Sequence, residues 1–329
     1  MRMAPATGIL LAMAAPALTQ AQPAAPRLSL PIACVVGRTC EVQNYVDRDP
    51  GPAARDYRCA GRTYDGHTGV DLRIPDMAAQ RRGVDVLAAA PGRVVRLRDG
   101  EPDISIRAPG APSVVGKACG NAVVVDHGGG WETQYCHLAR GSVRVAVGQA
   151  VTVGQPLGRI GLSGATEFPH LHFQVRRAGR TVDPFGSAAD GRCGLTATPP
   201  LWTREAAAGL TYKTGAVLNA GFAAGPVDME AIEDGRIAAP GGSSPMVAAY
   251  VRMIGLQKAD VIELVLAGPD GARLAYSRLA PLDHDKAQYM AYVGKRRSGG
   301  PWRPGVYRAQ VRVHRGGRVA LAKHFAARL

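Results

Sequence analysis

Histidine and aspartate residues that could bind a metal gather in one part of the chain. Five of the eight histidines lie between His67 and His172. The segment His67-Thr-Gly-Val-Asp71 pairs an imidazole with a carboxylate four positions away. In an extended chain these two side chains would lie about 13 Å apart, too far to share one ion through bonds of about 2 Å. Gly69 can supply the bend that brings them together.

A second pair of histidines, His170 and His172, lies in the segment Pro169-His-Leu-His-Phe-Gln-Val. Its β-branched and aromatic residues predict a strand, in which alternate side chains share one face about 7 Å apart. We therefore expect both imidazoles to face one cavity, while Leu171 and Phe173 point into a core. Two imidazoles and one carboxylate around zinc, with a fourth position for water, form a catalytic type of site. Such a site lowers the pKa of water from about 15.7 to about 7, which favours hydrolysis.

The elements that must position these groups are predicted to be β-strands. Between residues 87 and 175, short β-branched runs are separated by glycines, and the 3.6-residue period of a helix is not sustained. The short spacing favours an antiparallel sheet over alternating strands and helices. The predicted strands are residues 92–97, 122–125, 142–147, 157–160 and 171–175. We expect the domain that contains them, residues 57–195, to be mainly β.

A second domain is predicted for residues 196–329. Residues 187–200 have a loop composition that includes Cys193 and the pair Pro199-Pro200. Beyond them, strands of alternating polarity are joined by glycine-rich turns, the pattern of a small β-sandwich. The clearest strands are residues 246–254, 261–267, 272–277, 305–314 and 318–326, the last two forming a hairpin that turns at Gly316-Gly317. The predicted fold is therefore mainly β, an antiparallel-sheet domain followed by a C-terminal β-sandwich.

The first residues have the pattern of an export signal. Arg2 supplies a positive charge, residues 8–15 form a short apolar stretch, and Ala21 ends a run suited to signal peptidase. We predict a signal peptide at residues 1–21 and an N-terminal extension at residues 22–56. The apolar stretch is about half of what a bilayer crossing needs, and no later segment reaches about 18 apolar residues. We expect a periplasmic or secreted protein with no transmembrane helix in the mature chain, the alternative being a retained N-terminal anchor.

The chain carries an excess of positive charge. Lysine plus arginine exceeds aspartate plus glutamate by 40 to 26, which would suit an anionic polymer. Only six of these 40 residues are lysine, however, and no long basic run is present. A bias toward arginine, with abundant alanine, glycine and proline, is more typical of a GC-rich genome than of a binding surface. We therefore predict no nucleic-acid partner.

Six short motifs follow one another along the first domain. They are His-Thr-Gly-Val-Asp at 67–71, Ala-Ala-Ala-Pro-Gly-Arg-Val at 88–94, Val-Val-Val-Asp-His-Gly at 123–128, Tyr-Cys-His-Leu at 135–138, Gly-Gln-Pro-Leu-Gly at 154–158 and His-Leu-His-Phe at 170–173. In this order they resemble the M23 peptidases, the family of lysostaphin and related peptidoglycan endopeptidases. The resemblance runs from about Tyr64 to Pro184 and implies a Zn²⁺ cofactor, an M23-type antiparallel sheet and the peptide stems of peptidoglycan as substrate.

The resemblance also implies a role for each residue of the site. His67, Asp71 and His172 are the expected zinc ligands. His137 and His170 are the expected catalytic pair, which orients or deprotonates water and stabilises the oxyanion. The other histidines are expected to be core or surface residues, with His127 as a possible support of the site.

The chain departs from the family pattern near the site. Cys136, Glu167-Phe168 and Gln174 stand where the family often has alanine, Thr-Gly and glutamate. None of these changes removes a ligand, but together they put the substrate preference in question. An insertion at about residues 98–117 could form a lid or a wall of the groove.

These observations predict a zinc metallo-endopeptidase that hydrolyses peptidoglycan peptide crosslinks with metal-activated water. The alternative is a non-catalytic envelope module that binds cell wall or activates another wall hydrolase, but such relatives usually lack the metal ligands. A lipoyl or biotinyl carrier, suggested by residues 147–158, is disfavoured because no lysine lies at a suitable hairpin tip. For the C-terminal domain, binding to the wall and docking to an envelope protein partner remain equal alternatives.

Six cysteines in an exported chain predict disulfides. If residues 128–130 turn a hairpin, Cys136 comes near Cys119, and Gly120 permits the bend that brings the two Cα atoms within about 7 Å. The predicted pairs are Cys34–Cys40, Cys59–Cys193 and Cys119–Cys136. Because neighbouring side chains of a strand point to opposite faces, we expect the thiol of Cys136 to face away from the metal that His137 faces.

Overall fold

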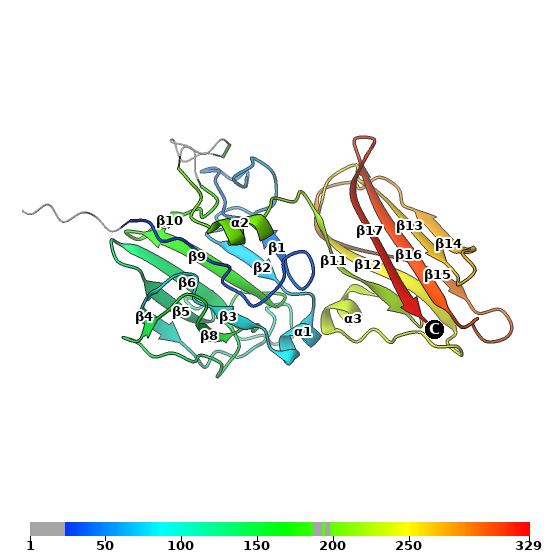
Figure 1. The fold of residues 1–329 in the computed structure, drawn as a ribbon, viewed down its shortest axis with the longest axis horizontal. Helices are drawn as coiled ribbons and strands as arrows, with labels where there is room; N and C mark the ends of the chain where they lie inside the picture. Colours follow the sequence, from blue (N-terminus) through cyan, green and yellow to red (C-terminus); the bar gives the residue numbers. More distant parts are fainter. Residues whose placement is uncertain (1–23, 187–192, 195–197) are drawn as a thin grey trace, which may run out of the picture.

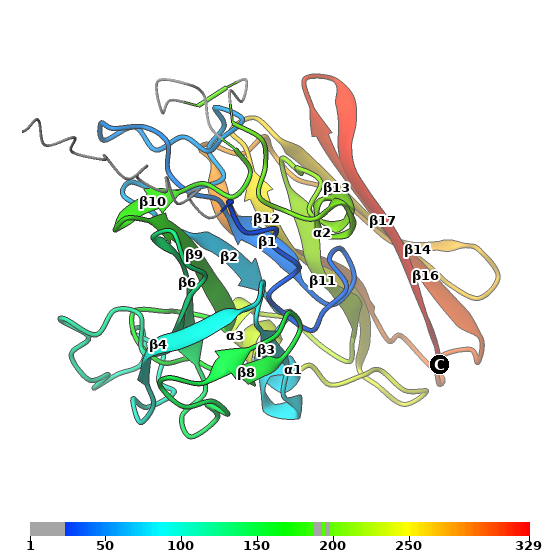
Figure 2. The same ribbon diagram turned by 60° about the vertical axis from the view of Figure 1, so that its left-hand side comes forward.

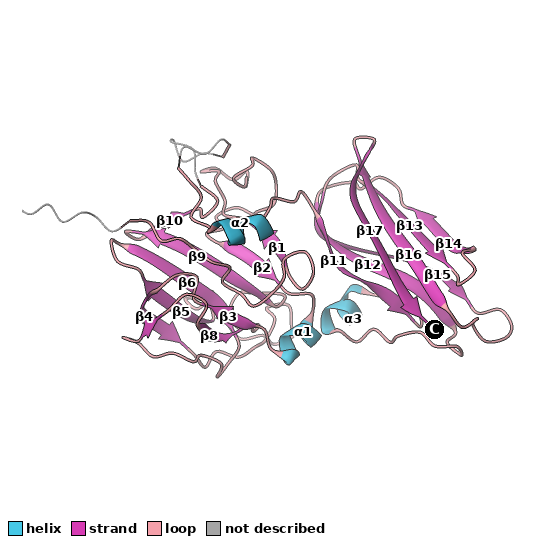
Figure 3. Ribbon diagram, viewed as in Figure 1, coloured by secondary structure: helices cyan, strands magenta, loops and turns pink. Residues whose placement is uncertain are grey.

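The structure is a computed structural model that describes residues 24–186, 193–194 and 198–329. The predicted signal peptide, residues 1–21, lies outside the described residues. Two mainly β domains lie side by side, and the short helices α1 (Met77–Arg82) and α3 (Met229–Asp234) meet between them (Figure 1 and Figure 3). Within the described part of the chain, no helix is long and apolar enough to cross a membrane.

A large antiparallel sheet forms the centre of the first domain. Its strands lie in the order β1 (Glu41–Asn44), β2 (Val70–Arg73), β9 (His170–Arg177), β6 (Trp131–Leu138), β5 (Asn121–Asp126), β4 (Gly92–Arg98) and β7 (Ala150–Val151), and β10 (Arg180–Val182) also pairs with β9. Figure 2 shows β1, β2, β9 and β6 as neighbours. The N-terminal extension therefore supplies a strand of this sheet beside β2.

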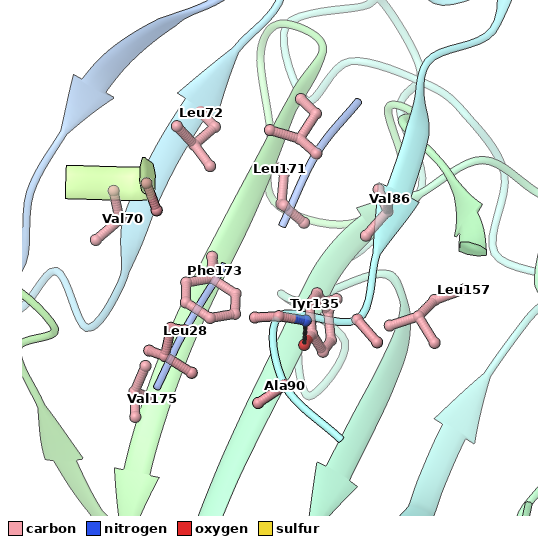
Figure 4. Close-up of a cluster of buried hydrophobic side chains, with 14 of the residues drawn as sticks. Leu28, Val70, Leu72, Val86, Ala90, Tyr135, Leu157, Leu171, Phe173 and Val175 are labelled. Atoms are coloured by element: carbon pink, nitrogen blue, oxygen red, sulfur yellow. Dashed lines mark hydrogen bonds between the residues drawn. The ribbon is translucent and has the colours of Figure 1, made fainter. Parts of the chain in front are cut away.

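The core of the first domain lies on one face of this sheet. Leu171 and Phe173 of β9 are fully buried there, opposite Leu72 and Val70 of β2. A two-stranded sheet of β3 (Asp85–Leu87) and β8 (Pro156–Arg159) contributes to the same cluster (Figure 4). Burying each such large apolar side chain contributes about 1.5–3 kcal/mol. As the alternation predicted, the apolar side chains of β9 hold the strand from one face and leave the other to the histidines.

One predicted strand of this domain is wrong. Residues 142–147 form no strand, although β4, β5, β8 and β9 lie at or near the predicted positions. One backbone hydrogen bond, from Arg144 N to Leu157 O, links this segment to β8. Val143 and Val145 still pack against the core, so their alternation reflects burial without a ladder of backbone hydrogen bonds.

The second domain is a sandwich of two antiparallel sheets. One sheet has the order β11 (Ala216–Ala223), β12 (Met246–Leu256) and β15 (Lys286–Arg296). The other has the order β14 (Arg273–Arg278), β13 (Val261–Ala267), β16 (Val306–Arg315) and β17 (Arg318–Arg328). The five predicted strands are present, while β11 and β15 were not foreseen. Gly316 and Gly317 turn the predicted terminal hairpin, and both have positive φ, which glycine tolerates.

The chain between the two domains packs on the first one. After the predicted boundary at residue 196, Leu201 and Trp202 are buried in the core of the first domain. Helix α2 (Arg204–Gly209) follows, begins at the Thr203 N-cap and buries Ala206 in the same core. We propose that the boundary between the domains lies after this helix, nearer residue 212 than residue 196.

The three predicted disulfides are all present. The bonded pairs are Cys34–Cys40, Cys59–Cys193 and Cys119–Cys136. Cys119 and Cys136 have Cα atoms 4.9 Å apart. Gly120 between them has a positive φ of 61°, so the predicted bend is there.

Candidate metal centre

The pairing of β2 with β9 brings the predicted ligands together. Asp71 and His172 are direct partners across the two strands, and His67 lies in the turn that leads into β2, where its backbone N–H bonds to Tyr64 O. Gly69 allows this approach for a different reason from the expected one. Its φ is not positive, but a Cβ atom there would lie 2.6 Å from Nε2 of His172. Only glycine leaves room for that ring.

Three side-chain atoms converge at the face of these strands. Nε2 of His67 lies 3.1 Å from Nδ1 of His172 and 3.1 Å from Oδ2 of Asp71. Nδ1 of His172 lies 3.0 Å from Oδ1 of Asp71. Spacings of this size fit ligand atoms that surround one ion at about 2.0–2.2 Å each. These residues are the His-Asp-His group that could hold a metal.

The hydrogen bonds of His67 leave the correct nitrogen available for a metal. Its Nδ1 lies 2.7 Å from Tyr45 O, and a carbonyl oxygen only accepts, so Nδ1 carries the proton. The lone pair of Nε2 therefore faces Asp71 and His172. A backbone carbonyl that fixes the tautomer in this way is typical of histidines that ligate metals.

The two predicted catalytic histidines face the same group with fixed tautomers. Nδ1 of His137 donates to Ser163 O at 2.7 Å. Nδ1 of His170 donates to Phe168 O at 3.0 Å, which leaves its Nε2 3.5 Å from Oδ1 of Asp71. The two rings are 4.7 Å apart between centroids. Two imidazoles thus lie beside the His-Asp-His group without belonging to it.

Burial and charge set the protonation of these groups. Burial, followed by His170 and His172, holds the pKa of His137 well below its usual 6.5, so this imidazole is neutral at neutral pH. Burial alone would raise the pKa of Asp71, but His67 and His170 hold it well below 3.8. A carboxylate and a neutral imidazole are the forms that bind a cation and accept a proton, respectively.

His137 reaches the groove through an unusual backbone conformation. Cys136 is the cross-strand partner of His172, so its side chain lies on the groove face. A regular strand would turn the next residue toward the core, but His137 has a φ of 62°, which returns its side chain to the groove. The expectation that Cys136 faces away from the metal is therefore wrong, because strict alternation fails at this residue. Such backbone strain is typical of functional sites.

Two residues near the group were missed from the sequence. Nδ2 of Asn44 donates to Oδ2 of Asp71 at 2.9 Å and so orients that carboxylate. The ring of Tyr64 lies 4.5 Å from that of His67 between centroids, and 54% of the tyrosine is exposed. No local signal marks Asn44, because its place depends on the pairing of β1 with β2.

A groove passes across the His-Asp-His group. One cavity of about 250 Å³ reaches from His67 and His172 to the disulfide Cys119–Cys136. A second cavity, of about 360 Å³, is lined by Asp71 and His170. Tyr64, His137 and Ala165 line both cavities. The geometry therefore leaves space for an extended chain on either side of the group.

The insertion after β4 forms part of the groove wall. Ile106 lines the cavity that contains Asp71, and its N–H bonds to Thr166 O. Arg107 pairs with Glu167 at 2.6 Å and ties the insertion to the segment before His170. These contacts correspond to a wall of the groove and not to a lid.

The remaining histidines have contacts away from the group. His127 lies between Pro91 O at 2.7 Å and Oγ1 of Thr133 at 2.8 Å. His284, His314 and His324 lie in the second domain, where their contacts are with Lys286, Glu263 and Gln310 respectively.

Two histidines and an aspartate converge in this groove of the β-sheet, with two further histidines alongside, and form a group that could hold a metal ion. Residues 65–184 match the family model described as Peptidase family M23. This part of the chain is therefore an M23 peptidase domain, as the motifs indicated.

Relatives with known names are similar over the same region. The peptidoglycan DD-endopeptidase ShyA of Vibrio cholerae is 41% identical over 64 residues, which are 20% of this chain and 14% of ShyA. The murein hydrolase activator EnvC of Escherichia coli is 42% identical over 65 residues, 20% of this chain and 15% of EnvC. The chain spans less than a quarter of the length of the curated relatives it matches.

Among solved structures, the catalytic domain of lysostaphin from Staphylococcus simulans has 23% identity and a TM-score of 0.29 to this chain. The match covers 43% of this chain and 86% of that domain.

Proposed function

We propose that this protein is a zinc metallo-endopeptidase that hydrolyses peptide crosslinks of bacterial peptidoglycan in the periplasm or outside the cell. The observation that carries the proposal is the complete site: His67, Asp71 and His172 converge, and two further histidines face them. The named endopeptidase ShyA supports the substrate class. The predicted export signal supports the location.

Zinc would be held by Nε2 of His67, the Asp71 carboxylate and Nδ1 of His172. Bound there, it would supply Lewis-acid chemistry that polarises a peptide carbonyl and lowers the pKa of water to about 7. His137, kept neutral by burial, accepts a proton at Nε2 as the water attacks. His170 faces the same place through Nε2 and, once that nitrogen also carries a proton, donates a hydrogen bond to the oxygen on which negative charge develops. Asn44 keeps the Asp71 carboxylate in its binding orientation.

A non-catalytic activator is the second candidate, because EnvC is named as an activator of murein hydrolases. The two candidates differ in what the metal site must do. A protein that acts only by docking to another hydrolase has no need of four histidines and an aspartate within one groove. The complete site therefore favours the peptidase.

Metal content and activity on purified peptidoglycan test this proposal. We expect about one zinc per mature chain, solubilisation of peptidoglycan, and loss of both after treatment with a chelator. His172→Ala should lose metal and activity together, whereas His284→Ala, which changes an exposed histidine of the second domain, should keep both. A zinc-loaded chain that releases nothing from peptidoglycan would overturn the peptidase and leave the activator.

A further inference from the structure

The second domain is fixed against the strand that carries Asp71. Arg73 of β2 is fully buried, and its guanidinium lies 2.5 Å from Glu233 of α3. The same carboxylate oxygen pairs with Arg252 of β12, which also donates to Pro75 O. A partly buried carboxylate that joins two fully buried guanidinium groups across the junction holds the domains in one arrangement, because separating them would leave charges unpaired.

The junction also touches the catalytic side of the site. The guanidinium carbon of Arg73 lies 3.7 Å from the ring centre of Phe168, within the range of a cation–π contact. The carbonyl of Phe168 is the acceptor that fixes the His170 ring. The second domain is therefore linked to the site through Arg73, which contacts Glu233 on one side and Phe168 on the other.

The groove continues across this junction. Ala287, at the start of β15, lines the cavity that contains Asp71 and His170. A third cavity, of about 220 Å³, shares Ala287, Gln43, Asn44 and Thr63 with it. From there it extends along the second domain to Gln257 and Asp285. A chain bound at the metal would thus have a second path that leads onto the C-terminal domain.

The chemistry of this third cavity suits a short peptide. Its buried cation, Arg62, already donates to the carbonyls of Gln43 and Lys213. At the rim, Asp285 carries one negative charge and Lys286 one positive charge, and the latter is engaged by Asp283 at 2.8 Å. Mixed charges among polar groups match a peptide arm with its own amine and carboxylate, and disfavour a polyanion. A volume below about 300 Å³ fits a segment of a residue or two.

We propose that the C-terminal domain supplies a subsite, at the cavity from Ala287 to Gln257, for the second arm of a branched, crosslinked peptide. This inference rests on the proposed function, since it assumes a peptide substrate at the metal. The domain then selects crosslinked stems over short linear ones, because only a substrate with a second arm beyond the scissile bond reaches from the groove into the subsite.

Occluding the subsite tests this inference in the full mature chain loaded with zinc. Gln257→Trp fills the far cavity without touching the cavity at the metal. We expect the ratio of kcat/KM for a purified crosslinked muropeptide dimer to that for a linear peptide with the same scissile bond to fall about tenfold or more. Ala326→Trp, on the exposed face of β17, is the matched control and should leave this ratio unchanged. Zinc content and melting temperature of each variant show whether it folds.

An unchanged ratio in a folded Gln257→Trp variant would overturn the subsite and leave the proposed function intact. If the wild type cleaves neither substrate, the proposed function fails. The subsite is then tested separately, by calorimetric measurement of the binding of the intact dimer. Weaker binding to Gln257→Trp than to wild type and Ala326→Trp would support the subsite. Equal binding to all three, or binding of isolated glycan strands at the same cavity, would contradict it.

Discussion

At the scale of single residues, three backbone carbonyls decide what the site can do. Tyr45, Ser163 and Phe168 each accept the Nδ1 proton of one histidine. The Nε2 atoms of these histidines are therefore left to face the ligand group. His137 and His170 have a free Nε2 but do not belong to the His-Asp-His group, so they are suited to proton transfer.

We expect His137→Ala to separate metal binding from catalysis. The substitution removes a proton acceptor but no ligand, so zinc content and melting temperature should stay close to wild type while turnover falls about 100-fold or more. Metal analysis and initial rates on peptidoglycan fragments measure the two effects, with His127→Ala as a control for losing a histidine of the same sheet. Loss of zinc from the His137 variant would assign this residue to the ligands.

The sequence predicted these residues unequally. The spacing of His170 and His172 correctly placed both imidazoles on one face of the strand. This prediction succeeded because the alternation of side chains in a strand depends only on neighbouring residues. The strained φ of His137 has no such local signal, so the direction of Cys136 was predicted wrongly. Asn44 could not be foreseen, since it meets Asp71 only through strand pairing.

At the scale of elements, the end of β6 that carries the proposed catalytic residue His137 depends on the loop before β5. The backbone N–H of His137 donates to Cys119 O at 2.9 Å, and the disulfide to Cys136 holds Cys119 in that position. The bridge therefore fixes both Cys136, which precedes His137, and Cys119, whose carbonyl accepts the His137 N–H. Because small displacements of a catalytic group can cost about 100-fold in rate, the position of this loop matters for activity.

We expect the double variant Cys119→Ser/Cys136→Ser to lose about 10-fold to 100-fold in turnover while it keeps zinc. The proposed ligands lie on β2, β9 and the turn before β2, so they do not depend on the bridge. Cys34→Ser/Cys40→Ser removes a disulfide from the N-terminal extension and is the control. Full activity of the first variant, measured by peptidoglycan digestion at equal zinc content, would show that the bridge does not position His137.

At the scale of the whole molecule, the two domains are joined by a charged contact in which Arg73 and Arg252 are fully buried. The two-domain plan and the sandwich followed from strand periodicity and turn residues. The junction could not be predicted in the same way. Arg73 and Glu233 are 160 positions apart in the chain, and the residues around each of them give no sign of the other. Neither amino-acid composition nor helix-capping residues predict that Arg73 and Arg252 contact Glu233.

Removing the shared carboxylate should weaken this junction strongly. Glu233→Ala leaves the buried guanidinium groups of Arg73 and Arg252 without a counter-charge, and we expect unfolding to become easier by about 3–5 kcal/mol. Glu230→Ala, on the same helix, removes an exposed partner of Arg236 and should change little. Denaturant unfolding monitored by fluorescence measures both. Equal stability of the two variants would mean that the charged contact does not hold the domains together.

Mass spectrometry of the fragments that this chain releases from purified peptidoglycan shows which bond it cleaves. If the chain is a crosslink-cleaving peptidase, crosslinked dimers convert to monomers, a new amine appears at the former crosslink, and the glycan strands stay intact. The His172→Ala variant should release none of these products. Free glycan ends in place of new amines would contradict the assignment.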